Sequence, residues 1–552
     1  MSETNSTDLT AIMGFEVKTG QVLKNLNSDL YDEWYYDCLN YKDLLSSKQH
    51  VHDKIATLTG EGMGRYPPEL RVVRNVPKKG LPVRYSLETD FYDRFIYQAI
   101  CSFLIKFFDP LLSHRVLSHR KAKTPSRYLF QNKIERWLTY EGVTYTFKDD
   151  KKYLLATDLA NYFENIRKKD IIGAFEKLLP KVAATSEQKQ QIRNALQLLD
   201  NCLDHWSFND GFGLAQNRDA SSFLANVVLN DIDRSMEQMG YDYYRYVDDI
   251  RVICRSETHA KSALMDLISC LRVRGLNINS AKTEILAHDS PQEDIEEHFP
   301  NRDPRVVAIE QMWKSRDKAI ILKSIKYLIA LLKECIKQDT TQSRTFRYAA
   351  NRLAQLSDAG VLTPEQLGDG NLRKVLLENV FDQPATTDYY CKILNLMGLD
   401  QSCVDEISGF LSDRARAIHD WQNYHLWMLL AKNAVKTAEL RSVAMSILKS
   451  TMNTAEAGAV IIWADQVGYK SVVNLSIKRF EPELPFQLQR YIAIATRNYP
   501  RKKLAGVYPK ISGKIKGTGD RASKFENETG RIVLPVREVT LPNLFDEMSE
   551  YD

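Results

Sequence analysis

The sequence predicts two successive architectures: an α+β region over residues 70–295, and an all-α region over residues 296–496. In the first region, short apolar strands and turn residues alternate with helical stretches. A loop-like, proline-containing run at 288–305 separates the two. Beyond that run, one amphipathic helical pattern follows another, which is typical of a bundle or a solenoid.

The helical region is predicted from buried stripes such as the one over residues 321–332. Its apolar residues follow the i, i+4, i+7, i+8, i+11 spacing of a single helix face: Ile321, Ile325, Leu328, Ile329 and Leu332. Antiparallel helices of this size stack on one another, so we expect a helical-repeat domain of the HEAT-like kind. The sequence shows no repeat period of its own.

The two ends of the chain have different compositions. Residues 1–69 mix polar and aromatic residues and are expected to form a mostly helical lead-in. Residues 497–552 are predicted to be a basic flexible tail, because nine basic residues and one acid, Asp520, lie between Arg497 and Lys524. A solvated tail and a phosphate-binding arm both fit this pattern.

Composition narrows the class of protein. The 552 residues are 44% hydrophobic and 26% charged, as in globular soluble proteins, and a net charge of +4 means that any nucleic-acid surface arises from local clustering. The eight cysteines are dispersed without a Cys-x-x-Cys pair, which argues against a zinc module and favours reduced thiols. Without an 18-residue apolar span or a signal peptide, we expect a cytoplasmic protein with no membrane partner.

The most informative feature is the tetrapeptide Tyr-Val-Asp-Asp at 246–249, inside a hydrophobic hairpin pattern. Asp248 and Asp249 fall at the turn between two strands, where their carboxylates are exposed. Two adjacent carboxylates at the tip of a sheet are suited to holding a divalent metal. The alternative is an ordinary Asp-Asp turn, since aspartate favours turns through its local hydrogen bonds.

A third carboxylate strengthens the metal hypothesis. The short apolar strand predicted at 153–158 ends in Asp158. Three carboxylates from two adjacent strands match the needs of two Mg²⁺ ions, with Mn²⁺ as the alternative. Hard oxygen ligands without histidine or cysteine favour these metals.

Two further segments accompany the carboxylates. Residues 213–226 form a glycine-opened loop that leads into a helix, and Gln216 stands just before that helix, where its amide would reach a nucleotide. Residues 275–286 end in a strand that carries Lys282 near the site.

The order of these elements resembles the polymerase core of reverse transcriptases. In that family an aspartate strand (here 158–166), a Gln-containing loop and helix (213–226), the Tyr-x-Asp-Asp hairpin (246–249) and an Asn-x-x-Lys-Thr segment (279–283) follow one another. Upstream, 77–84 resembles the fingers segment that grips the triphosphate, and 93–99 the helix after it. The resemblance covers about residues 70–290 and implies a right-hand fingers and palm.

The resemblance implies roles for individual residues. Asp158, Asp248 and Asp249 would be the metal ligands, and Phe163 the steric gate that excludes a ribose 2′-hydroxyl, although an ordinary core phenylalanine is the alternative. Lys282 would donate a proton to pyrophosphate, unless it is simply an exposed strand lysine. The nucleotide-binding residues would be Gln216, Tyr246, Arg84 and either Lys78 or Lys79.

The chain departs from the family pattern in two places. The usual Pro-Gln-Gly is Ala215-Gln216-Asn217, which removes the glycine of a tight turn and affects the grip on template and primer. No Cys-rich endonuclease or RNase H pattern follows the palm; helices follow instead. This combination resembles the bacterial abortive-infection and unknown-group reverse transcriptases, which act in antiphage defence.

The resemblance implies an RNA-directed DNA polymerase or nucleotidyltransferase that uses dNTPs and binds DNA, RNA or both. Within that group some members form oligomers, some make DNA without a template or from a protein primer, and others use a partner noncoding RNA. We therefore expect a homo-oligomer. The alternatives are a retron- or group II intron-like enzyme that copies a bound noncoding RNA, and a non-enzymatic helical scaffold with an inactive palm.

A cationic patch at 112–123 is the remaining feature. It contains Arg115, Arg120 and Lys123 and lies near the predicted path of a nucleic-acid strand. Phosphate contact and a solvated loop explain it equally well.

Overall fold

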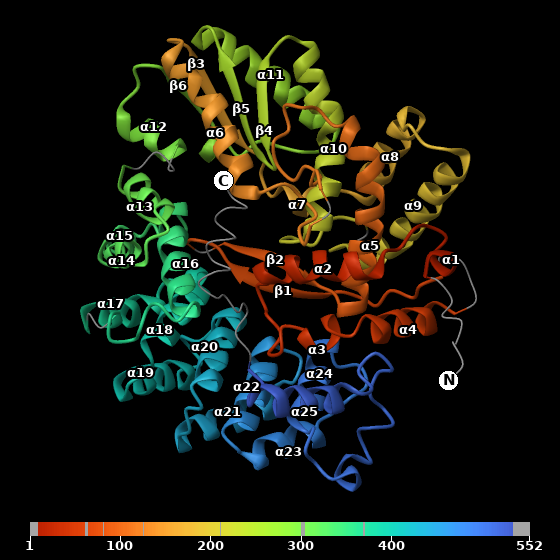
Figure 1. The fold of residues 1–552 in the computed structure, drawn as a ribbon, viewed down its shortest axis with the longest axis vertical. Coiled ribbons are helices and arrows are strands. Elements are labelled where there is room, and N and C mark those ends of the chain that lie inside the picture. Colours follow the sequence, from red (N-terminus) through yellow and green to blue (C-terminus); the bar gives the residue numbers. More distant parts are fainter. Residues whose placement is uncertain are drawn as a thin grey trace.

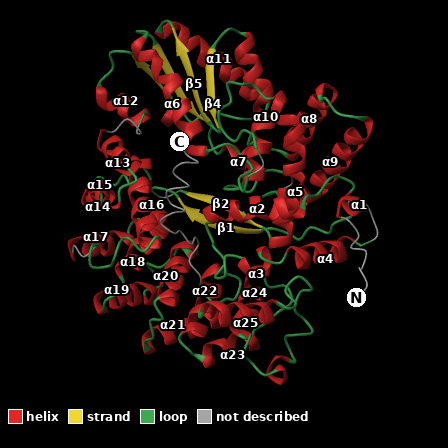
Figure 2. Cartoon of the chain, in the orientation of Figure 1, coloured by secondary structure: helices red, strands yellow, loops and turns green. Residues whose placement is uncertain are grey.

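The computed structural model describes residues 9–60, 65–80, 82–124, 126–209, 211–299, 304–367 and 370–533. Figure 1 shows the sheet at one end of the molecule, a strand hairpin at its centre, and helices that lead from the sheet around to the N-terminal segment. Strands of the described part form only the four-stranded sheet and that hairpin (Figure 2). No helix in the described ranges has the length and apolar character to cross a membrane.

The N-terminal segment is helical, as the sequence predicts. Its helices are α1 (Leu9–Met13), α2 (Thr19–Asp29), α3 (Lys42–Leu45) and α4 (Lys48–Thr59). They pack around α5 (Phe91–Phe108), which is buried on most of its surface. The Asp90 side chain caps α5 by accepting the backbone N–H groups of Tyr92 and Asp93.

The palm sheet has the strand order β4-β5-β3-β6, with every neighbouring pair antiparallel. Its strands are β3 (Tyr153–Asp158), β4 (Asp242–Tyr246), β5 (Asp249–Cys254) and β6 (Glu284–Ala287). Helices α10 (Asp219–Gln238) and α11 (Glu257–Val273) cover one face, and α6 (Lys133–Asp149) packs on the strands from the other. The register sets Asp158 directly opposite Asp249.

Three more helices complete the region around the sheet: α7 (Tyr162–Asn165), α8 (Lys168–Leu178) and α9 (Ser186–Trp206). Two strands, β1 (Val72–Pro77) and β2 (Val83–Glu88), pair as the antiparallel hairpin that the resemblance assigns to the fingers. We call it the fingers hairpin.

The rest of the described chain is helical. These helices are α12 (Gln292–His298), α13 (Pro304–Lys314), α14 (Lys318–Lys323), α15 (Ile325–Lys337), α16 (Arg344–Asp358), α17 (Gly370–Val380), α18 (Thr387–Met397), α19 (Gln401–Ser412), α20 (Asp420–Lys432), α21 (Ala438–Ser450), α22 (Ala455–Gln466), α23 (Lys470–Lys478), α24 (Phe486–Ala495) and α25 (Thr518–Thr529).

These helices stack in two rows. Helices α16, α18, α20, α22 and α24 contact one another in succession, and α19, α21 and α23 form a second row. The predicted stripe at 321–332 is buried, but it is divided between α14 and α15, which meet at Ser324. The two rows agree with the predicted stacking of helices, and a HEAT-like repeat stays a prediction.

The fingers hairpin packs directly on the helical region. Val76 of β1 belongs to the same apolar core as the helices from α13 onwards, together with Tyr35. The Tyr35 hydroxyl donates to the backbone oxygen of Asn75 (3.1 Å), and the Arg74 guanidinium lies 3.7 Å from Asp420 of α20. The helical region therefore packs against the fingers hairpin through β1.

The C-terminal segment is folded where it is described. Arg490 of α24 is fully buried and forms ion pairs with Asp37 (2.7 Å) and Asp43 (2.6 Å) of the N-terminal segment. Helix α25 follows, with Thr518 and Ala522 buried. The prediction of a flexible tail is wrong for residues 497–533, because internal ion pairs use part of their positive charge; residues 534–552 lie outside the described ranges.

Lys514 is the clearest case of a tail residue with an internal partner. Its ammonium group is buried and lies 2.5 Å from Asp90 and 3.4 Å from Asp93, at the start of α5. Burial acts to lower the pKa of Lys514, but the two carboxylates raise it above its usual value. The C-terminal segment is thus joined by buried charge pairs to the start of α5.

Replacing Lys514 by methionine should leave Asp90 and Asp93 buried without their cation. We expect the free energy of unfolding to fall by about 3–5 kcal/mol, the cost of breaking a buried ion pair, in urea denaturation followed by circular dichroism. Lys510→Met, at an exposed position in the same segment, is the matched control and should change little. Equal stability of the two variants would contradict the assigned role of Lys514.

Candidate active site

The structure places the three predicted aspartates at the same end of the sheet. Asp158 ends β3, and Asp249 begins β5 directly across from it. The Leu159 N–H donates to the backbone oxygen of Asp248 (3.3 Å), which ties the strand end to the β4–β5 turn. Asp158 is buried, and the other two are partly buried.

This clustering changes the electrostatics of the carboxylates. Burial, followed by the charges of Asp249 and Asp158, raises the pKa of Asp248 to about 8. Burial and Asp158 also raise the pKa of Asp249. Three like charges in a poorly solvated place repel one another, and a cation relieves that repulsion.

The residue types at this end of the sheet suit a hard divalent cation, although their side chains are not arranged as a metal site in the described residues. The Oδ1 atom of Asp158 is buried and has no hydrogen-bond partner, so one carboxylate oxygen is left over for a ligand. Carboxylate oxygens are the ligands that Mg²⁺ prefers. The Oδ2 atom of Asp158 instead accepts from Lys282 (2.6 Å), and within the described ranges no three Cys, His, Asp or Glu side chains are arranged to hold a metal ion.

Lys282 is placed beside the carboxylates by a short 3₁₀ turn, Ser280–Lys282. The Asn279 N–H donates to the Asp158 backbone oxygen (2.6 Å), and the hydroxyl groups of Thr283 and Thr157 lie 2.7 Å apart. Partial burial acts to lower the pKa of Lys282, and Asp158 raises it, with a net increase. Its ammonium group is therefore protonated at neutral pH.

The turn that carries Asp248 has an unusual backbone. Val247 adopts φ +57°, in the left-handed region, where a β-branched residue costs about 1–3 kcal/mol. Both of its peptide groups are bound by side chains. Its N–H donates to Ser118 Oγ (2.8 Å), and its carbonyl oxygen accepts from Arg245 Nη1 (2.7 Å).

Arg245 is a fully buried charge whose partners converge beneath the turn. Asp233 of α10 accepts two of its N–H groups at 2.7 Å each, and Asn226 Oδ1 accepts a third at 3.0 Å. The Asn226 side chain also donates to the Ser118 backbone oxygen (2.9 Å). We call these four residues, Ser118, Asn226, Asp233 and Arg245, the turn support.

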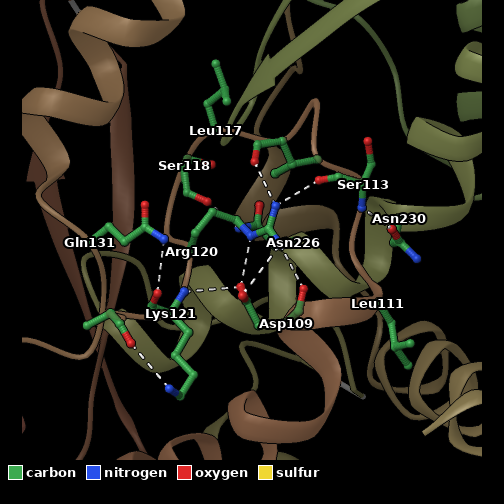
Figure 3. Close-up of polar contacts among 12 residues, drawn as sticks. Asp109, Leu111, Ser113, Leu117, Ser118, Arg120, Lys121, Gln131, Asn226 and Asn230 are labelled. Atoms are coloured by element: carbon green, nitrogen blue, oxygen red, sulfur yellow. Dashed lines mark hydrogen bonds and ion pairs between the residues drawn. The ribbon is translucent and has the colours of Figure 1, made fainter. Parts of the chain in front are cut away.

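The loop that supplies Ser118 is itself held by polar contacts (Figure 3). Arg120 pairs with Asp109 (2.9 Å) and donates to the backbone oxygen of Ser113 (2.9 Å). The backbone N–H of Ser113 in turn donates to the side chain of Asn230 of α10 (3.0 Å). Arg115 pairs with Asp242 (2.7 Å). Two arginines of the cationic patch thus hold the loop in place, which weakens the phosphate-binding interpretation of the patch.

The fingers hairpin distinguishes the two candidate lysines. Lys78 Nζ donates to Asn161 Oδ1 (3.2 Å), three residues after Asp158. Lys79 points elsewhere and pairs with Asp339 (3.2 Å) of the helical region. Arg84 lies over the Trp34 ring (5.4 Å), and burial together with Arg347 lowers its pKa.

Phe163 and Gln216 lie on neighbouring segments. The Leu214 N–H donates to the Phe163 backbone oxygen (2.8 Å), and Gln216 donates to Glu164 (3.2 Å). Phe163 is only partly buried at the edge of the core. Asn217 adopts φ +58°, the left-handed region that a glycine enters without strain, and asparagine tolerates this conformation better than most residues.

Tyr246 is packed rather than free. Its hydroxyl donates to the Lys133 backbone oxygen (2.9 Å), and its ring meets that of Trp137 edge-on at 4.8 Å. The turn support is absent from the sequence prediction, although one signal was present. Arg245 and Tyr243 lie two positions apart and share the buried face of β4, where a charge requires buried partners.

Ser118→Ala should loosen the turn, because it leaves the Val247 N–H without its acceptor. We expect a loss of about 1–3 kcal/mol in unfolding free energy and faster amide hydrogen exchange in peptides that cover 243–250. Ser269→Ala, at an exposed position of α11, is the control. Unchanged exchange in the Ser118 variant would mean that the turn is held by other contacts.

Comparisons with known proteins identify the domain that contains this site. A family model described as reverse transcriptase (RNA-dependent DNA polymerase) matches residues 94–349. Among solved structures, telomerase from Candida albicans with the TWJ fragment of telomeric RNA shares 10% identity over 68% of this chain and 64% of that chain, with a TM-score of 0.30. Apo telomerase from Candida tropicalis shares 11% identity over 73% of this chain and 66% of that chain, with a TM-score of 0.28.

The chain thus spans just under two thirds of the length of either telomerase. No curated protein matches the chain. The carboxylate site and all four elements of the palm lie inside the matched residues. The chain therefore contains a reverse transcriptase domain, the domain of RNA-dependent DNA polymerases, over residues 94–349.

Proposed function

We propose that the protein is a DNA polymerase of the reverse transcriptase type, which transfers deoxynucleotides at Asp158, Asp248 and Asp249. The observation that carries this proposal is the position of Asp158 directly across from Asp249, with Asp248 in the adjoining turn. One of their oxygens, Asp158 Oδ1, is buried and unpaired. Such a group is poised for cations and destabilising without them.

The same three aspartates would hold the metal ions of this reaction, Mg²⁺ or Mn²⁺. When bound, the ions supply positive charge to the attacking and leaving oxygens of nucleotidyl transfer. Lys282 holds a proton at Nζ next to Asp158, where it is available to the departing pyrophosphate. Lys78 and Arg84 would bind the phosphates of the incoming nucleotide, because Lys79 is paired with Asp339 and Lys78 lies beside Asn161.

We further propose that this polymerase acts in bacterial antiphage defence, as a homo-oligomer. The support is the resemblance to abortive-infection and unknown-group enzymes, together with a helical region that packs on the fingers hairpin. A retron- or group II intron-like enzyme and an inactive scaffold are the competing functions. The identity of the product separates these alternatives.

Asp248→Asn should abolish DNA synthesis, since it removes one of the carboxylates that would hold the metal ions. We expect incorporation of labelled dNTPs to fall at least about 100- to 1,000-fold, with phage plating restored to the level of cells without the protein. Asp294→Asn, at an exposed position of α12, is the control and should leave both unchanged. Resistance to phage that survives in the Asp248→Asn variant would show that defence does not require DNA synthesis.

Sequencing the product of the unaltered protein distinguishes the modes of synthesis. DNA joined to protein without a matching template would indicate untemplated, protein-primed synthesis. DNA complementary to a co-purified RNA would indicate a templated enzyme of the retron type. The absence of product in both the unaltered protein and the variant would favour the scaffold.

Phe163→Ala should admit ribonucleotides, because the ring stands two residues after Asn161 at the edge of the site. We expect the preference for dATP over ATP, measured as the ratio of kcat/KM, to fall about 10- to 100-fold. Phe212→Ala removes a partly exposed phenylalanine from a nearby loop and serves as the control. An unchanged ratio in the Phe163 variant would place the sugar gate elsewhere.

A further inference from the structure

The first turn of α16 lies next to the fingers hairpin. Lys79 of the hairpin pairs with Asp339, which belongs to the turn between α15 and α16 (3.2 Å). The Ser343 side chain caps α16 by accepting the Phe346 N–H. Figure 1 shows α16 between the hairpin and the outer helices of the helical region.

Arg344, the first residue of α16, reaches the catalytic hairpin through one aromatic ring. Its guanidinium carbon lies 3.2 Å from the centre of the Trp137 ring, which in turn contacts the Tyr246 ring at 4.8 Å. Burial lowers the pKa of Arg344, against the opposing charges of Glu141 and Asp249. Arg344 is therefore close enough to interact with the carboxylate site.

Arg347 stands one helical turn further along and is exposed. Its positive charge adds to burial in lowering the pKa of both Arg84 and Arg344. The Nε atom of Arg84 is buried and has no hydrogen-bond partner. The guanidinium groups of Arg84, Arg344 and Arg347, from two separate regions, thus act on one another electrostatically, and a polyanion among them would relieve their repulsion.

We propose that Arg344 and Arg347 bind the phosphate groups of the incoming nucleotide opposite Arg84 and Lys78. The helical region then supplies one wall of the nucleotide site. This inference rests on the proposed polymerase function and adds two specific residues to it. Arginine suits the task because its planar group binds phosphate oxygens in pairs.

A nucleotide fits these positions better than a strand of nucleic acid. Lys78 reaches Asn161, three residues after Asp158, so the turn of the fingers hairpin lies near the end of the strand that carries Asp158. A strand would need cations spread along its backbone. The arginines best placed for that, Arg115 and Arg120, already pair with Asp242 and Asp109.

The test measures equilibrium binding in the presence of Mg²⁺, with dATP, inorganic tripolyphosphate and a primer–template duplex as separate probes. The variants are Arg347→Gln, Arg344→Gln and the pair together, and Arg347→Lys keeps the charge. Arg416→Gln, at an exposed position of the same helical region, is the control. Because Arg347 is exposed, its variants should keep the thermal unfolding temperature of the unaltered protein.

We expect the double variant to bind dATP and tripolyphosphate about 10- to 100-fold more weakly, the factor that charge-assisted hydrogen bonds supply. Arg347→Lys should retain part of the affinity, and the duplex should bind as before. Loss of duplex binding with unchanged dATP binding would assign the arginines to a strand and overturn the proposal. Unchanged binding of all three probes would overturn it as well.

The same measurements separate this proposal from the polymerase function. If the unaltered protein binds dATP through these arginines but incorporates none, the polymerase proposal fails and the nucleotide site stands. If the unaltered protein polymerises and the variants bind dATP normally, the polymerase stands and the role of α16 fails. Binding needs no catalytic turnover, so it is informative in both cases.

Discussion

The candidate site depends on the buried ion pair between Arg245 and Asp233. An arginine without solvent is tolerated only when its N–H groups are matched, and here Asp233, Asn226 and the Val247 carbonyl accept them. In return, Arg245 and Ser118 bind both peptide groups of a valine in the left-handed region. The strained turn is what presents Asp248 and Asp249 to Asp158. The charge pair therefore determines where the carboxylates meet.

A second set of buried charges connects the ends of the chain. Arg490 joins Asp37 and Asp43, and Lys514 joins Asp90 and Asp93, so the C-terminal segment is attached both to the N-terminal segment and to the start of α5. The fingers hairpin shares its core with the helical region. Because these contacts restrict how the two regions move, the helical region is part of the architecture of the site.

Opposite charges are arranged on two sides of the site. Burial, followed by repulsion among the carboxylates at the tip of the sheet, raises the pKa of Asp248. Burial, followed by the charge of Arg347 of α16, lowers the pKa of Arg84 in the fingers hairpin. A net charge of only +4 conceals this separation. Metal cations would neutralise the carboxylates, and the phosphates of a nucleotide would neutralise the arginines. Nucleotidyl transfer brings both to one site.

The sequence by itself determined the local elements: the strand that ends in Asp158, the hairpin around 246–249, the helix after Gln216 and the succession of helices beyond the palm. Each depends on a short-range period or on turn chemistry, which neighbouring residues decide. Only the tertiary structure decided the folding of residues 497–533, the different partners of Lys78 and Lys79, and the turn support. Arg490 and Asp37 are 453 positions apart, and no local pattern encodes that they meet. Their pairing follows from the packing of whole helices, which places distant charges where burial forces them to find partners.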